Sequence, residues 1–147
     1  MRSKSNLLLI LGAFLILGFG ALVLFLPKGE GATVKRGEKL YMQQCMNCHG
    51  KDGKGLGKLI PGLHHAELLQ KERLICAIRY GKSGPLEVDG QVYNGQMPPN
   101  FTLDDGEIRD IVNYVYTQFA EAPKSLDLPE VQDQLRNCAQ ANPRLQW

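Results

Sequence analysis

The chain has 147 residues and a net charge of +2, with 44% apolar and 22% charged residues and a mean hydropathy of −0.22. These averages are typical of a small soluble protein, but residues 7–26 contain no charged or polar side chain. That run excludes a wholly soluble chain, a disordered chain and a membrane protein with several spans. Residues 33–82 hold ten basic and four acidic side chains and residues 83–120 hold one and six, a change of sign that argues against a nucleic-acid partner.

The apolar run near the N-terminus predicts a membrane anchor over residues 1–26. At about 1.5 Å per residue, a helix over the run reaches about 30 Å, the thickness of the hydrocarbon core of a bilayer. Arg2 and Lys4 precede it and favour a cytoplasmic N-terminus. A cleaved signal peptide is the alternative, but its apolar region usually has about 7–15 residues. We therefore expect a single-pass protein of a bacterial cytoplasmic membrane, whose remaining chain follows a short linker at 27–32 on the periplasmic side.

The next feature is Cys45-Met-Asn-Cys48-His49, a C-x-x-C-H motif typical of c-type haem attachment. Two thiols three positions apart can each add to one vinyl group of a haem, and the following histidine is then held beneath the iron as an axial ligand. Redox dithiols and half zinc sites also use C-x-x-C, but Cys76 and Cys138 are too far apart to form a second pair at zinc-ligand spacing, and no βαβ pattern follows. The motif therefore predicts one haem c, covalently attached through Cys45 and Cys48.

Helical periodicity and helix-start signals predict the elements around this motif. Residues 50–58 contain four glycines and are expected to form a loop. Residues 81–99 are rich in Gly and Pro and are also read as a loop, long enough to wrap a haem, and no strand pattern is convincing. The predicted helices are a first helix leading into the haem motif, short helices at 65–69 and 71–80, a helix from Asp104 to Phe119 and a tail helix that includes Cys138.

The two remaining cysteines, Cys76 and Cys138, lie in two of these helices. An exported chain meets an oxidising compartment, where a leftover pair favours a disulfide. In the tail, Asp127 and Glu130 resemble a capping box. We predict that Cys76 and Cys138 are bridged; the alternative is that each is a small buried apolar residue.

Beyond the motif, the chain resembles the class I cytochrome c family over roughly residues 33–120. Gly37 and Tyr41 stand where the family's first helix carries a glycine and an aromatic residue. Ile111 and Tyr114 match the positions of the last helix that cross this pair. The resemblance implies an all-α fold, a class I cytochrome c-like helical domain around one haem. Together with the anchor and linker, it divides the chain into a haem domain at 33–120 and a C-terminal helical extension at 121–147.

The same resemblance implies further haem contacts. Pro61 matches the proline whose carbonyl accepts the N–H of the axial histidine, and Leu63 matches a haem-packing leucine. Met97, followed by Pro98, lies where the family has its second axial ligand, so His49 and Met97 are the predicted metal ligands.

For some of these side chains another assignment is open. Met42 and Met46 compete with Met97 for the sixth position, but they lie on the segment that leads into the histidine side. Arg79 is included as a candidate partner of a haem propionate, and the alternative for it is an ordinary surface arginine. His64 and His65 depart from the family pattern and are expected in a loop or at the surface.

An iron ligated by histidine and methionine has no open position, which implies a one-electron carrier rather than an enzyme with a small-molecule substrate. We expect a membrane-anchored monohaem cytochrome that passes electrons in a respiratory chain, between a quinol-oxidising complex and a terminal oxidase or reductase. Its partners are then the membrane and redox proteins. One alternative is a fixed cytochrome c subunit of a larger respiratory complex, which the short linker favours, and another is a haem-based sensor module.

Overall fold

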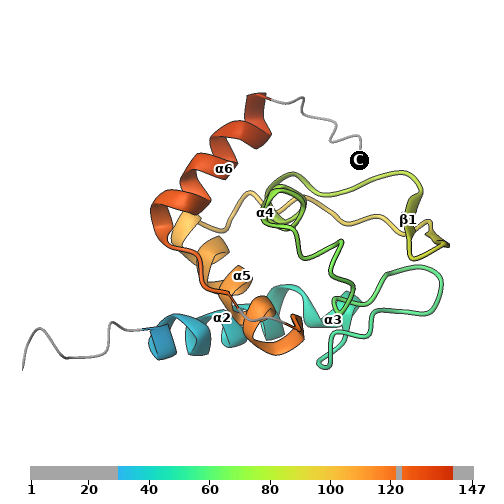
Figure 1. The fold of residues 1–147 in the computed structure, drawn as a ribbon, viewed down its shortest axis with the longest axis horizontal. Helices are drawn as coiled ribbons and strands as arrows, with labels where there is room; N and C mark the ends of the chain where they lie inside the picture. The colour runs from blue at the N-terminus through green and yellow to red at the C-terminus, as the bar shows by residue number, and fades with distance from the viewer. Residues whose placement is uncertain (1–29, 122–123, 141–147) are drawn as a thin grey trace, which may run out of the picture. The chain divides into compact units, whose positions relative to one another are not determined.

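The computed structural model describes residues 30–121 and 124–140. Within them there are five helices and a two-stranded antiparallel hairpin, which lies to one side of the helices (Figure 1). The elements are α2 (Glu30–Gln44), α3 (Met46–His49), α4 (Lys71–Tyr80), β1 (Leu86–Val88), β2 (Gln91–Tyr93), α5 (Asp105–Phe119) and α6 (Leu128–Gln140). The predicted anchor at 1–26 and the first part of the linker lie outside the described residues. In the described ranges no helix is long and apolar enough to cross a bilayer.

The expected helical architecture is confirmed, but two details of the expected secondary structure, the long loop and the short helix at 65–69, were wrong. The fold is not purely helical, because β1 and β2 pair within the predicted long loop, joined by a two-residue turn. Both turn residues, Asp89 and Gly90, have positive φ angles of 49° and 76°, as a type I′ hairpin turn requires. Residues 65–69 form consecutive turns rather than a helix, and α2 begins at Glu30, so part of the predicted linker is helical.

Helices α2 and α5 cross at a glycine. A Cβ atom built on Gly37 would lie 1.9 Å from the backbone oxygen of Asp110 and 2.9 Å from Cβ of Tyr114, so no other residue allows this approach. One turn later, the rings of Tyr41 and Tyr114 are in contact in a tilted arrangement, with centroids 5.2 Å apart. The predicted crossing of Gly37 and Tyr41 by the last helix of the domain is therefore present.

A capping box starts α5: the Asp104 side chain accepts from the backbone N–H of Glu107, whose side chain accepts in return. At the other end, the buried Asn113 side chain both accepts from the N–H of Leu126 and donates to its carbonyl. This pair of hydrogen bonds fixes the segment that leads into α6 against α5.

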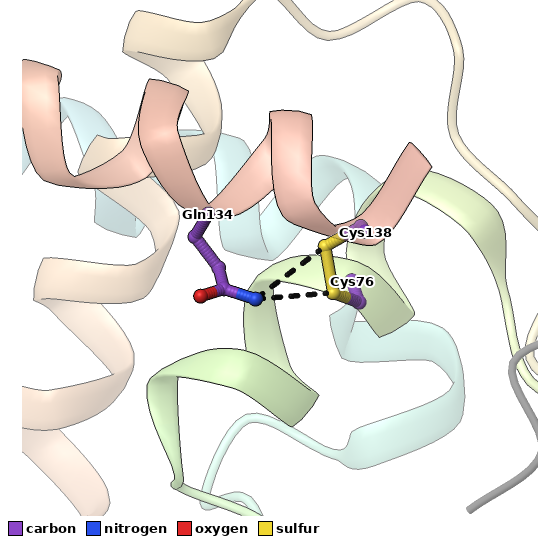
Figure 2. Close-up of a disulfide and its surroundings, with 3 residues drawn as sticks. All are labelled: Cys76, Gln134 and Cys138. Atoms are coloured by element: carbon purple, nitrogen blue, oxygen red, sulfur yellow. Dashed lines mark hydrogen bonds between the residues drawn. A yellow bond between two sulfur atoms is a disulfide. The ribbon is translucent and has the colours of Figure 1, made fainter. Parts of the chain in front are cut away.

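The disulfide between Cys76 and Cys138 is confirmed, with Cα atoms 5.6 Å apart. It joins α4 to α6 across 62 residues of sequence, and α6 lies beside both α4 and α5 (Figure 1). Figure 2 shows the side chain of Gln134 pointing at the bridge, its amide nitrogen 3.6 Å from one sulfur and 3.8 Å from the other. The tail helix is therefore fixed to the main domain by a covalent bond as well as by packing.

Candidate haem site

A largely apolar cavity of about 400 Å³ lies among α3, α4, α5 and the hairpin. Its volume is within the range of protein sites that hold a cofactor. Six of the seven residues predicted to contact a haem line it, and these are Cys45, Cys48, His49, Pro61, Leu63 and Met97. The structure therefore brings together side chains that are up to 52 positions apart in the sequence.

The C-x-x-C-H motif forms a tight helical turn at one wall of the cavity. Cys45 is the N-cap of α3, and its carbonyl accepts from the N–H groups of Cys48 and His49 at 3.2 and 3.0 Å. Gly50 ends the turn with a φ of +77°, and its carbonyl accepts a hydrogen bond from the Tyr41 hydroxyl at 2.7 Å. The helix-crossing tyrosine therefore also fixes the end of the motif.

The two thiols of the motif are unbridged, as attachment to a haem requires. Burial, followed by the neighbouring Cys48, raises the pKa of the Cys45 thiol to about 11. A redox dithiol of the C-x-x-C type instead has a lowered thiol pKa. The surroundings of Cys45 therefore do not favour the dithiol alternative. The zinc alternative has no support either, because no group of three or more potential His, Cys, Asp or Glu ligands occurs within residues 30–121 and 124–140.

The imidazole of His49 is set among apolar groups. Burial lowers the pKa of His49, and the backbone of Pro61 acts in the opposite direction. Since proline has no N–H, its contribution comes from its carbonyl, the acceptor that the family resemblance implies. The Nδ1 atom of His49 is buried and has no hydrogen-bond partner among the described residues. If the other ring nitrogen bound iron, the Pro61 carbonyl would be the acceptor for this N–H. Leu63, which is 7% exposed, follows on the same wall.

The backbone of Met97 is held in place by α4 and the segment after it. The N–H and the carbonyl of Met97 pair with Lys82 at 2.9 and 2.8 Å. The preceding Gly81 has a φ of +74°, and a Cβ there would lie 2.4 Å from the Met97 carbonyl. Two residues before the methionine, the N–H of Gly95 donates to the carbonyl of Leu59 at 2.9 Å. The thioether is thus carried by a segment fixed on both sides.

The other methionines and the loop histidines lie elsewhere. Met42 and Met46 pack against the hydrophobic core and do not line the cavity. His64 hydrogen-bonds the Asp52 carbonyl at 2.9 Å, and His65 pairs with Asp89 at 2.6 Å. Of the sulfur and imidazole donors outside the motif, only Met97 reaches the cavity among the described residues.

The structure places Arg79 away from the walls of the cavity. Its guanidinium donates to the Leu103 carbonyl at 2.8 Å and to the Asp105 carboxylate at 3.0 Å, and it does not line the cavity. On α4 the cavity-lining residues are Arg73, Leu74, Ala77 and Ile78, which recur at helical spacing on one face. Arg79 is on another face, whereas Arg73, which we missed, is on this one. The helical period over α4 was the signal that could have separated the two arginines.

A haem fits this set of donors. Two free thiols, one imidazole and one thioether all border a single apolar cavity, and this is the combination that a covalently held, six-coordinate haem uses. Cys45 and Cys48 would hold the macrocycle, while His49 and Met97 would hold the iron.

Comparison with known proteins agrees with this assignment. The family model for cytochrome c matches residues 34–118. A cytochrome c-552 from Thermus thermophilus is 38% identical over 118 residues, which cover 76% of this chain and 72% of the relative. A second cytochrome c-552 from the same species is 39% identical over 94 residues, covering 60% of this chain and 71% of that protein. This chain belongs to the cytochrome c family and carries one covalently attached haem c.

Proposed function

We propose that this protein is a monohaem one-electron carrier. The observation that carries the proposal is the convergence of His49 and Met97 on the same apolar cavity as the two attachment cysteines. When bound, the haem supplies reversible one-electron exchange between ferric and ferrous iron. A role in electron transfer also fits the two similar Thermus proteins, both of which are named cytochromes.

The chain's own residues set the conditions of that exchange. His49 and Met97 would both hold the iron, which would leave no site on it for a substrate or for water. The soft sulfur of Met97 raises the reduction potential relative to a second histidine. Ile111 and Val115 from α5 line the cavity, and such apolar groups exclude water. The backbone of Met97 is hydrogen-bonded to that of Lys82, which would help to keep the thioether in position as a ligand.

We further propose that the carrier is anchored in a bacterial cytoplasmic membrane, with its haem domain on the periplasmic side. The support is the apolar run at residues 7–26 with Arg2 and Lys4 before it. In that setting it would carry electrons in a respiratory chain, from a quinol-oxidising complex to a terminal oxidase or reductase. Fractionation of cells that make the full chain tests the anchor: haem staining is expected in the membrane fraction, resistant to a salt wash and released by detergent.

A fixed subunit of a larger respiratory complex is the alternative within the same function. The predicted linker at 27–32 is short, and α2 begins within it at Glu30, which restricts the distance that a tethered domain can travel. Purification in a mild detergent separates the two. A mobile carrier elutes alone, and a fixed subunit elutes with other subunits in constant ratio.

Potentiometric titration of the holoprotein tests the proposed function. The haem absorbance should follow a reversible one-electron curve. The ferrous protein should not bind carbon monoxide at neutral pH, because Met97 would prevent a further ligand from binding to the iron. Rapid and complete binding of carbon monoxide would contradict the carrier and favour the sensor alternative.

A further inference from the structure

A second hollow in the surface lies between the end of α4 and the C-terminal half of α6. It is an open groove of about 480 Å³, to which α4 contributes Arg79 and Tyr80, α5 contributes Asp105, and α6 contributes Leu135, Arg136 and Ala139. None of these six residues lines the haem cavity. The groove is therefore separate from the site described above, and the proposed function gives it no role.

The two sides of the groove are held in place before any ligand binds. On one side, the Arg79 guanidinium donates to the Asp105 carboxylate at 3.0 Å. On the other side, Cys138, the residue before Ala139, is bridged to Cys76 of α4 (Figure 2). Because the disulfide joins the two helices that form the groove, little has to be ordered when the groove is filled, and this lowers the cost of binding.

An exposed aromatic surface adjoins the groove. Phe101 is 68% exposed, more than any other large apolar side chain in residues 30–121 and 124–140. Its ring contacts that of Tyr80 edge-on, with centroids 6.4 Å apart, and Tyr80 lines the groove together with Leu135. The side chain of Arg136, which is 65% exposed, also lines the groove. Apolar and aromatic side chains beside an exposed guanidinium suit a ligand that carries a large aromatic ring.

The chain itself supplies such a ring close to the groove. Residues 141–147 follow α6 and lie outside the described residues, and they include Leu145 and Trp147, the only tryptophan of the sequence. Pro143 disfavours continuation of the helix. Seven extended residues reach about 23 Å, whereas the part of α6 that lines the groove is about 10 Å long at 1.5 Å per residue. A segment that starts just after Ala139 is therefore long enough to fold back over the groove.

We propose that residues 141–147 bind in this groove, with Leu145 and Trp147 covering Tyr80 and the adjoining Phe101. Burial of an aromatic side chain removes a large apolar area from water. The segment and the groove belong to one molecule, so binding costs little translational freedom. The groove is then an intramolecular docking site that holds the end of the tail against α4.

Cleavage by trypsin tests this inference, because the bond after Arg144 is accessible only when the segment has left the groove. In a brief digestion of the full-length holoprotein in detergent, mass spectrometry should show this cleavage about tenfold slower than in Ala139→Tyr, whose added ring fills the groove, since cleavage follows the population of the open form. Asn137→Tyr is the matched control, because it adds the same ring at an exposed position of α6 that does not line the groove. It should be cleaved as slowly as the unmodified protein.

A second variant and the protein concentration separate the proposed occupant from others. Trp147→Ala removes the ring from the segment instead of filling the groove, and it should be cleaved about as fast as Ala139→Tyr. Protection in the unmodified protein should be the same at all protein concentrations. Equal cleavage of the unmodified protein, Ala139→Tyr and Trp147→Ala would overturn the inference. Protection that increases with concentration would also overturn it and would assign the groove to a second copy of the chain. The haem spectrum should be the same in all these variants, so failure of the proposed function would be seen separately.

Discussion

Two buried tyrosines, Tyr41 and Tyr116, differ in the hydrogen bonding of their hydroxyl groups. The Tyr41 hydroxyl donates to the Gly50 carbonyl at 2.7 Å. The buried hydroxyl of Tyr116 has no hydrogen-bond partner among the described residues, although the Lys124 ammonium lies 5.1 Å from the centre of its ring. A buried polar group without a partner costs about 1–3 kcal/mol, whereas a made hydrogen bond contributes about 1 kcal/mol net.

We therefore expect phenylalanine to have opposite effects at the two positions. Tyr116→Phe should raise the free energy of unfolding of the holoprotein by about 1 kcal/mol, and Tyr41→Phe should lower it by about 1 kcal/mol. Denaturant unfolding followed by circular dichroism measures both. A loss of stability in Tyr116→Phe as large as that in Tyr41→Phe would show that the Tyr116 hydroxyl is satisfied.

The pKa of the Tyr116 hydroxyl predicts that the stability of the folded protein depends on pH in the alkaline range. Burial, followed by the charges of Glu72 and Glu130, raises the pKa of Tyr116 from 10.0 to about 12. The unfolded chain therefore loses this proton first, and the stability contributed by the neutral phenol is complete below pH 10 and lost as the pH rises towards 12.

Tyr116→Phe cannot ionise, so its stability advantage over the unmodified protein should grow between pH 10 and 12 by about 1 kcal/mol per pH unit. Unfolding free energies of the two proteins at several pH values give this difference, in which effects common to both cancel. A constant difference across the range would mean that the phenol has an ordinary pKa in the folded protein.

Gly37 makes the closest approach of two helices possible. In Gly37→Ala the new methyl group meets the backbone oxygen of Asp110, which cannot move without the whole of α5. We expect a loss of about 1–3 kcal/mol in unfolding free energy. Gly31→Ala is the matched control on the same helix, because a Cβ there meets no atom within 4 Å. It should be neutral or stabilising by up to about 1 kcal/mol, and equal losses in the two variants would refute the role of the crossing.

At the scale of elements, α4 connects the cavity with the tail. One face carries Arg73 and Ala77 to the cavity, while Cys76 on another face is bridged to α6. Gly81 follows the end of α4, and the next residue, Lys82, is hydrogen-bonded through its backbone to the backbone of Met97. The disulfide therefore stabilises the helix from which the methionine segment is positioned.

Removal of the bridge should be costly. For the 62-residue separation, the chain-entropy relation gives a loss of about 4 kcal/mol. The double variant Cys76→Ala/Cys138→Ala should show this loss in guanidinium unfolding of the holoprotein, and a reductant should destabilise the unmodified protein but not the variant. Gln134→Ala keeps the bridge and serves as the control. Equal stability with and without reductant would contradict the account.

The elements also show where sequence reasoning succeeded and failed. The bridge could be predicted because two cysteines remained once the haem motif was assigned. The hairpin was not predicted, because the Gly and Pro content of the segment was taken as the sign of a loop. Asp89-Gly90 between alternating side chains is, however, a strong signal for a two-residue turn. The pairing of Lys82 with Met97 could not be predicted from local patterns, since it joins backbone groups whose partners depend on the tertiary fold.

At the scale of the whole molecule, the hydrophobic core of the described elements borders the cavity, and Leu63, Leu74, Ile78, Ile111 and Val115 among others line it. Helices α3, α4 and α5 and the hairpin each contribute side chains to its wall, so the haem acts as part of the core. This arrangement explains why C-x-x-C-H, Pro61 and Met97 could be placed from sequence: each is tied to the haem. Arg79 could not be placed in this way, because its identity as a cation does not reveal which face of α4 it occupies.

If Met97 and His49 both hold the iron, no position is left for a further ligand, and the protein is an electron carrier. The absorption spectrum of the oxidised holoprotein tests this ligation most directly, because sulfur bound to ferric haem gives a weak far-red band. We expect the band in the unmodified protein and in Met42→Ala, whose side chain packs in the core and away from the cavity, and we expect its loss in Met97→Ala. Absence of the band from the unmodified protein, or its persistence in Met97→Ala, would contradict this ligation.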